Sequence, residues 1–146
     1  YEAERTYAWL KEQATALGVQ NRIYCAGYRN DLPEVLGALD IGLISSVGSE
    51  ANSRAALEFM ACGKPVISTS VGVIPEIIQN QEQGLIVPPC DIEQMGRAME
   101  KLVANPVLRI NMGKAARKKV LDNFSLDKFG AVMESVYAKL LRTSQN

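Results

Sequence analysis

The sequence predicts an α/β fold, with a Rossmann-like parallel sheet that is covered by helices on both faces. Short apolar runs of strand length alternate with longer segments of helical periodicity. The expected strands cover residues 22–26, 40–44, 66–69 and 84–89, the last leaving through two prolines. Such alternation implies right-handed crossovers between parallel strands. Because 146 residues suffice for one core, we expect residues 1–146 to form a single domain.

The composition excludes several classes of function. Sixteen basic and sixteen acidic residues give a formal charge of zero, which argues against a nucleic-acid partner. No apolar run approaches the ~18 residues that can span a membrane. Histidine is absent, so the chain itself has no histidine-based acid–base or metal chemistry. Cys25, Cys62 and Cys90 match no metal or redox spacing, and we interpret them as reduced thiols of a cytoplasmic protein.

A helix is expected first, at Glu2–Leu17, and Gly18 ends it. An α/β unit should begin with a strand, so we expect this chain to be cut from a longer one. The strand at 22–26 and a second helix at Leu32–Leu39 follow. In the first helix, the apolar residues at core spacing are Tyr7, Leu10, Ala14 and Leu17.

The central stretch of the chain connects the strand at 40–44 to the strand at 66–69. A small polar loop at 45–51 precedes a run of good helix formers from Asn52 to Ala61. Asn52 or Ser53 is the expected N-cap, because a short side chain with an oxygen can accept from the free amides of the first turn. Gly63 is free to take a positive φ angle and ends the helix.

Two carboxylates, Glu50 and Glu58, stand eight positions apart across this loop-to-helix junction. The helix N-terminus between them is a general anion site that suits phosphate. With ~3.6 residues per turn, Glu58 lies about two turns into the helix. The carboxylates can then accept from hydroxyl groups on either side of a bound diphosphate, as a nucleotide-sugar would offer. Alternatively, both glutamates are solvated surface charges.

The central stretch resembles the donor-binding motif of the retaining glycosyltransferases of family 4, which have the two-domain GT-B fold. The family pattern is roughly a serine, a short gap, a glutamate, seven residues and then Glu-Ala-Met-Ala-Cys-Gly-Lys-Pro-Val-Ile. Residues 58–67 of this sequence read Glu-Phe-Met-Ala-Cys-Gly-Lys-Pro-Val-Ile. The resemblance covers nearly the whole chain. It implies the C-terminal, donor-binding half of a GT-B fold, truncated at its N-terminus.

The resemblance implies a role for each matching residue. Glu50 would contact the transferred sugar and is the catalytic candidate, and Glu58 would hold the ribose hydroxyls. Backbone amides near Asn52, Ser53 and Arg54 would contact the diphosphate or the sugar. Where the family often has Gly-Phe-Gly-Leu, this chain has residues 51–54, Ala-Asn-Ser-Arg. Asn52 and Arg54 could therefore touch donor oxygens directly, or Arg54 is only a surface residue, and the identity of the donor stays open.

Two further loops enter the expected site through the same resemblance. Gly27, Tyr28 and Arg29 are candidates for contact with the nucleotide base. In the alternative, this loop is a plain turn in which Asp31 is an N-cap and Tyr28 is half buried. The loops at 27–31, 45–53 and 69–76 all follow expected strands, so they should gather at one edge of the sheet.

The loop after the strand at 66–69 matches a second family motif, Gly-Gly-Xaa-Pro-Glu. Gly72, Pro75 and Glu76 match it, whereas Val73 replaces the second glycine. We expect Gly72 and Glu76 to lie beside the donor. In the alternative, this segment only connects a strand to a helix, with Pro75 in the first turn.

Three helices are expected in the last third of the chain. Asp91, with Gln94 three residues on, should cap the first, and Asn105-Pro106 should begin the second. The third should pack on the domain or on an absent partner domain. The apolar face of the first consists of Ile92, Met95, Met99 and Leu102. The stripe of the third consists of Phe129, Val132, Met133, Val136, Tyr137, Leu140 and Leu141.

The second of these helices has a basic face with two interpretations. It could contact an anionic membrane surface, or it could be a solvated helix with cations near its C-terminal end. The basic residues are Arg109, Lys114, Arg117, Lys118 and Lys119.

The sequence thus predicts a donor domain for the transfer of a hexose-type sugar from a nucleoside diphosphate sugar to an acceptor, with retention of configuration. The expected partners are the nucleotide-sugar donor and an absent N-terminal acceptor domain, with neither a metal nor another cofactor. We expect the isolated chain to be inactive, because the resemblance places the acceptor domain and further diphosphate-binding residues outside it. A nucleotide-sugar binding module without chemistry, and an interaction domain with a decayed site, remain alternatives.

Overall fold

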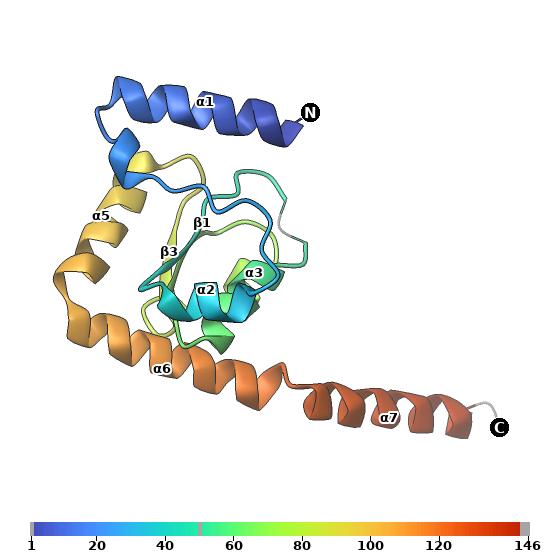
Figure 1. Cartoon of the computed structure of the whole chain (residues 1–146). Helices are drawn as coiled ribbons and strands as arrows, with labels where there is room; N and C mark the ends of the chain where they lie inside the picture. Colours follow the sequence, from blue (N-terminus) through green and yellow to red (C-terminus); the bar gives the residue numbers. More distant parts are fainter. Residues whose placement is uncertain (1, 50, 144–146) are drawn as a thin grey trace. The chain divides into compact units, whose positions relative to one another are not determined.

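The computed structural model describes residues 2–49 and 51–143. The chain divides into two compact units, the first ending at Leu32 and the second beginning at Pro33. The first unit contains the expected helix, α1 (Glu2–Ala16), and a short 3-10 helix, η1 (Gln20–Arg22) (Figure 1). Contrary to the expected core spacing, Tyr7 and Leu17 of this unit are exposed.

The strand predicted at 22–26 does not form. Ile23 has extended backbone angles, φ −111° and ψ 124°, yet no strand pairs with this segment in the described part of the chain. An extended segment becomes a strand only when a neighbouring strand accepts and donates its backbone hydrogen bonds. The β-branched and aromatic residues here suit a strand, but no such ladder is formed within the described residues.

The second unit contains a three-stranded parallel sheet within the described residues. Its strands are β1 (Gly42–Ile44), β2 (Val66–Thr69) and β3 (Gly84–Val87), in the order β1-β2-β3. Every residue of the central strand β2 is buried. The connections contain the helices α3 (Arg54–Ala61) and α4 (Ile74–Ile77), and α2 (Leu32–Ala38) precedes β1. This arrangement confirms the predicted α/β fold class.

Two apolar clusters cover the two faces of this sheet. Val66 and Ile67 are neighbours in β2, so their side chains point to opposite faces. Val66 packs in a cluster with residues of α3 and α4, and Ile67 packs in a cluster with residues of α5 (Ile92–Ala104). Helix α6 (Pro106–Asn123) contributes Ala116 to the first cluster and Met112 to the second. The predicted coverage of the sheet on both faces is therefore present.

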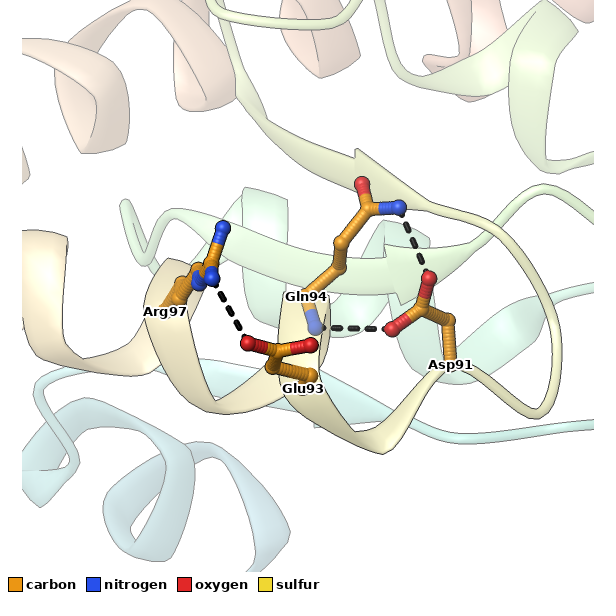
Figure 2. Close-up of polar contacts among 4 residues, drawn as sticks. All are labelled: Asp91, Glu93, Gln94 and Arg97. Atoms are coloured by element: carbon orange, nitrogen blue, oxygen red, sulfur yellow. Dashed lines mark hydrogen bonds and ion pairs between the residues drawn. The ribbon is translucent and has the colours of Figure 1, made fainter.

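The cap of α5 forms at Asp91, as the sequence predicts (Figure 2). Its Oδ1 accepts from the Gln94 backbone amide at 2.9 Å, and its Oδ2 accepts from the Gln94 side chain at 2.7 Å. The hydrogen bond from the Gln94 backbone amide is the main reason why the pKa of the Asp91 carboxyl lies below its ordinary value, and the hydrogen bond from the Gln94 side chain is the second. The helix is thereby fixed at its start, directly after β3.

The apolar face predicted for α5 is partly wrong. Leu102 is buried and Met95 is half-buried, but Ile92 is 87% exposed and Met99 is also exposed. The small residue Ala98 takes a buried position instead. A helix packed on a sheet buries only the narrow stripe of side chains that faces the sheet. Which side chains form that stripe depends on how the helix lies on the sheet.

Helix α6 begins as predicted, with Asn105 Oδ1 accepting from the Leu108 amide at 3.0 Å. Two of its basic residues, Arg109 and Arg117, donate to backbone carbonyls of other helices, and Lys118 pairs with Asp122. These internal contacts favour a structural interpretation of the basic face over a membrane surface.

The last helix, α7 (Leu126–Thr143), has the predicted period, but most of its apolar stripe is exposed. In Figure 1 it extends away from the sheet of its own unit. The alternative in which the whole stripe packs on this domain is therefore wrong, and packing on an absent partner domain stays a prediction. Across the described residues, no helix combines the length and apolar character needed to cross a bilayer.

Candidate functional site

Three loops leave the sheet of the second unit at one edge. Because β1, β2 and β3 are parallel neighbours, the segments that follow Ile44, Thr69 and Val87 all start at the carboxyl edge of the sheet. Thr69 Oγ1 donates to the Ser46 carbonyl at 2.5 Å and ties the first loop to the end of β2. The expected gathering of the loops at 45–53 and 69–76 is thus present in this unit.

Helix α3 begins at this edge, and its N-cap residue is Ser53. The predicted side-chain cap is absent, because the Ser53 side chain accepts no amide hydrogen bond. Ser53 is only 1% exposed, and its hydroxyl has no hydrogen-bond partner in the part of the chain that the structure describes. Leaving a buried hydroxyl unpaired costs about 1–3 kcal/mol. The Arg54 amide donates to the Asn52 carbonyl at 2.7 Å, so among the described residues the groups left for a ligand at this helix end are the next amides of the first turn and the Ser53 hydroxyl.

Glu58 lies in the middle of α3 and is partly accessible. Its side chain is 35% exposed, and Arg54 Nη2 lies 3.3 Å from its Oε1. The Arg54 side chain is 81% exposed, so the pair is a surface contact that adds little stability. Asn52, just before the helix, is exposed as well. The predicted residues Asn52, Ser53, Arg54 and Glu58 thus lie on one short element at the carboxyl edge.

Two further predicted residues, Gly72 and Glu76, lie in the segment that follows β2. Gly72 follows β2, is exposed and has φ 57°, a backbone angle that favours glycine. Glu76 is an exposed residue of α4, the helix that begins after Gly72. Glu50 lies outside the described residues, so its role stays a prediction.

The loop at 27–31 belongs to the first unit. Gly27 has φ 64°, and Tyr28 is 93% exposed, so a half-buried Tyr28 is wrong. Arg29 donates to both carboxylate oxygens of Asp31, and its guanidinium lowers the pKa of that carboxyl. An exposed tyrosine next to a fixed arginine remains available for a ligand.

The structure adds features of this edge that the sequence analysis missed. A hollow of about 170 Å³ lies between the three loops. It includes Cys90, whose φ of 62° is unusual for a residue with a side chain. No pattern in the sequence indicates this hollow. Its lining residues are Ser45, Val47, Thr69, Pro88, Cys90, Asp91, Ile92 and Met95.

A second missed feature concerns the motif that follows α3. Lys64 Nζ donates to the Gly37 carbonyl at 2.6 Å, at the end of α2. The motif lysine thus connects the turn after α3 to the end of α2, and its place in the Gly-Lys-Pro run could have suggested such a turn contact.

The N-terminal end of α3 and the Glu58 carboxylate can together bind a ligand that has both an anionic group and hydroxyl groups.

Comparison with known proteins identifies the family of this chain. The family described as "Glycosyl transferases group 1" matches residues 4–119. N-acetyl-alpha-D-glucosaminyl L-malate synthase of Bacillus anthracis is 32% identical over 130 residues, which are 89% of this chain and 34% of that protein.

Two solved structures show the same fold. The C-terminal domain of the group 1 glycosyl transferase LpcC from Francisella tularensis has a TM-score of 0.74 and 26% identity, over 84% of this chain and 64% of that one. HepE of Anabaena, solved in complex with UDP-glucose, has a TM-score of 0.85 and 22% identity, over 92% of this chain and 37% of that one. At that identity, HepE supports the fold alone.

The chain thus spans about a third of the length of curated relatives such as the Bacillus anthracis synthase, at 34%. Its fold is that of GT-B glycosyltransferases, and the family match covers most of the chain. This chain belongs to the group 1 glycosyl transferases.

Proposed function

We propose that this chain is the donor-binding part of an enzyme that moves a hexose-type sugar from a nucleoside diphosphate sugar to an acceptor, with retention of configuration. The observation that carries the proposal is the N-terminus of α3. There, the Ser53 hydroxyl is buried without a partner, and Glu58 stands further along the same helix.

The proposed placement of the donor follows from charge and spacing. The diphosphate lies at the free amides of α3, where the helix dipole favours negative charge. Glu58 is five residues beyond Ser53, about 7.5 Å along the axis at 1.5 Å per residue. That span suits the ribose next to a diphosphate, and the Glu58 carboxylate would accept from its hydroxyls. Glu50 is proposed to contact the transferred sugar.

We also propose which nucleotide the donor carries and which further domain the enzyme contains. The HepE structure contains UDP-glucose, and we propose a UDP-sugar as the donor here. Because the chain spans only 34% of the Bacillus anthracis synthase, we propose that an acceptor-binding domain completes the enzyme. Membrane contact through α6 is left out of the proposal, because Arg109, Arg117 and Lys118 have internal partners.

A titration of the chain with UDP, GDP and ADP, followed by calorimetry, tests the proposal. We expect UDP to bind more tightly than GDP and ADP, and we expect no sugar transfer by the isolated chain. Turnover by this chain alone would refute the need for a second domain. Failure of all three nucleotides to bind to the full-length enzyme would contradict the donor site itself, whereas failure with this chain alone would show that residues outside it are needed.

Replacing Ser53 with alanine is expected to separate stability from binding. The change removes a buried hydroxyl without a partner, so the free energy of unfolding should rise by about 1 kcal/mol. The affinity for UDP and for inorganic pyrophosphate should fall, because an anion loses a donor at the helix end. Urea unfolding and calorimetry measure the two effects.

The matched control for this prediction is Ser135→Ala, which removes an exposed hydroxyl of α7, outside the loops of the site. It should not change the affinity for UDP or for pyrophosphate. A Ser53→Ala chain that binds pyrophosphate as the wild type does would show that the hydroxyl plays no part in anion binding.

A further inference from the structure

Helix α6 carries two arginines that make the same kind of contact with two different helices. Arg117 Nη1 donates to the Ala61 carbonyl in the last turn of α3. Arg109 Nη1 donates to the Leu102 carbonyl near the end of α5, at 2.9 Å. The last carbonyls of a helix have no partner within it, and a cation there also complements the helix dipole. Each arginine therefore fixes the C-terminal end of one helix.

The end of α3 is held against α6 by backbone as well as by Arg117. A Cβ atom built at Gly113 would lie 2.1 Å from the Gly63 carbonyl oxygen, so the two backbones touch. The stem of Arg117 passes over the same turn, with its Cδ 3.9 Å from a Cβ built at Gly63. This cluster of Gly113, Arg117 and the turn at Gly63 is called the α3 clamp below.

The two ends of α3 are held very differently. At the C-terminal end, the α3 clamp supplies close backbone packing and a charged donor. At the N-terminal end, the Ser53 side chain makes no capping hydrogen bond. A helix of eight residues is about 12 Å long and moves as a rigid rod. A tilt at the clamped end would therefore displace Glu58 and the free amides at the other.

We propose that Arg117 is a positioning residue of the donor site. It acts through α3, because its hydrogen bond to the Ala61 carbonyl sets the orientation of the helix that presents Glu58 and the anion-binding amides. This inference rests on the proposed function. Misplacement of a binding group by about 1 Å can cost large factors in a positioned reaction, so a contact distant from the ligand can control it.

The test compares Arg117→Met with Arg109→Met. Both variants remove one positive charge. Arg117→Met loses the hydrogen bond to the Ala61 carbonyl, and Arg109→Met loses those to the Leu102 and Val103 carbonyls, at 2.9 and 3.4 Å. Only Arg117 holds the helix of the site. We expect Arg117→Met to weaken UDP binding by roughly tenfold, as loss of about 1.4 kcal/mol would. Arg109→Met should change it less than about twofold, although it also loses the 3.4 Å ion pair with Asp40. Calorimetry gives the affinities, and urea unfolding gives both stabilities.

Each outcome decides a different question. If the wild type binds UDP and Arg117→Met binds it equally well, the inference is wrong while the proposed function stands. Equal losses in both arginine variants would indicate general destabilisation or charge and would also overturn it. If the full-length wild-type enzyme binds no nucleotide, the proposed function fails and the inference fails with it.

A second variant keeps the inference testable if Arg117→Met does not fold. Arg117→Lys keeps the charge but loses the planar guanidinium fork. Its UDP affinity is expected to fall by about threefold, between the wild type and the methionine variant. An unaltered affinity in Arg117→Lys, in a chain where Arg117→Met does not fold, would assign Arg117 to stability alone.

Discussion

Replacing Glu58 with alanine is expected to weaken UDP binding by about 100-fold, since hydrogen bonds to a charged group contribute about 1.5–3 kcal/mol. The proposed role of Glu58 is to accept from both ribose hydroxyls, and alanine accepts from neither. The stability of the chain should hardly change, because the Glu58 side chain is 35% exposed and its ion pair is with the exposed Arg54. Calorimetric titration with UDP measures the loss.

The chain offers a matched control for this change. Glu93 is a carboxylate of α5 that pairs with Arg97, four residues after it, at 2.6 Å, whereas Glu58 pairs with Arg54, four residues before it, at 3.3 Å. Figure 2 shows the Glu93–Arg97 pair beside the cap of α5. Glu93→Ala removes the same charge and the same kind of pair, and UDP affinity should stay at the wild-type value. Similar losses in the two variants would mean that Glu58 acts only through net charge.

A finer comparison uses nucleotides that differ in the sugar. If Glu58 holds the ribose hydroxyls, the wild type should prefer UDP to 2′-deoxy-UDP, and Glu58→Ala should bind both with similar affinity. A preference that survives in Glu58→Ala would place the ribose contact elsewhere and leave Glu58 without the role that we propose.

Replacing Gly113 with alanine is expected to cost about 3 kcal/mol or more of unfolding free energy, because overpacking of a tight contact costs 1–3 kcal/mol and sometimes more. The new Cβ would lie 2.1 Å from the Gly63 carbonyl oxygen, which is backbone and cannot rotate away. Helices α3 and α6 would have to separate. Because α3 carries the proposed donor site, UDP affinity should fall as well.

Gly96 provides the control for this helix glycine. It lies in α5, and a Cβ built there would meet nothing within 4 Å. Gly96→Ala should therefore raise the free energy of unfolding, by about 0.5–1 kcal/mol, because alanine favours helix over glycine. If Gly113→Ala were as stable as Gly96→Ala, the close contact between α6 and the turn at Gly63 would be contradicted. Urea unfolding of both variants decides this.

The sequence located the residues of the candidate site better than their contacts. Asn52, Ser53 and Arg54 lie at the start of α3 and Glu58 lies in its middle, within the run of helix formers that predicted this helix. The capping role predicted for Asn52 or Ser53 was wrong, since the N-cap residue is Ser53 and its buried hydroxyl makes no capping hydrogen bond. A serine before a helix has the same local sequence pattern whether its side chain caps the helix or is buried without capping it. The direction of its side chain depends on what packs around it.

By itself, the sequence determined the α/β class, the positions of β2 and β3, the turn at Gly63, and the caps at Asp91 and Asn105. These signals are local, because periodicity, glycine and short polar side chains act within one or two turns of the chain. Only the tertiary structure decided which helix faces are buried, that residues 22–26 form no strand, and that Arg117 reaches a carbonyl 56 residues away. These features depend on segments distant in the sequence. Hydrophobic periodicity shows that a face is apolar, whereas its burial depends on the partner that the fold places against it.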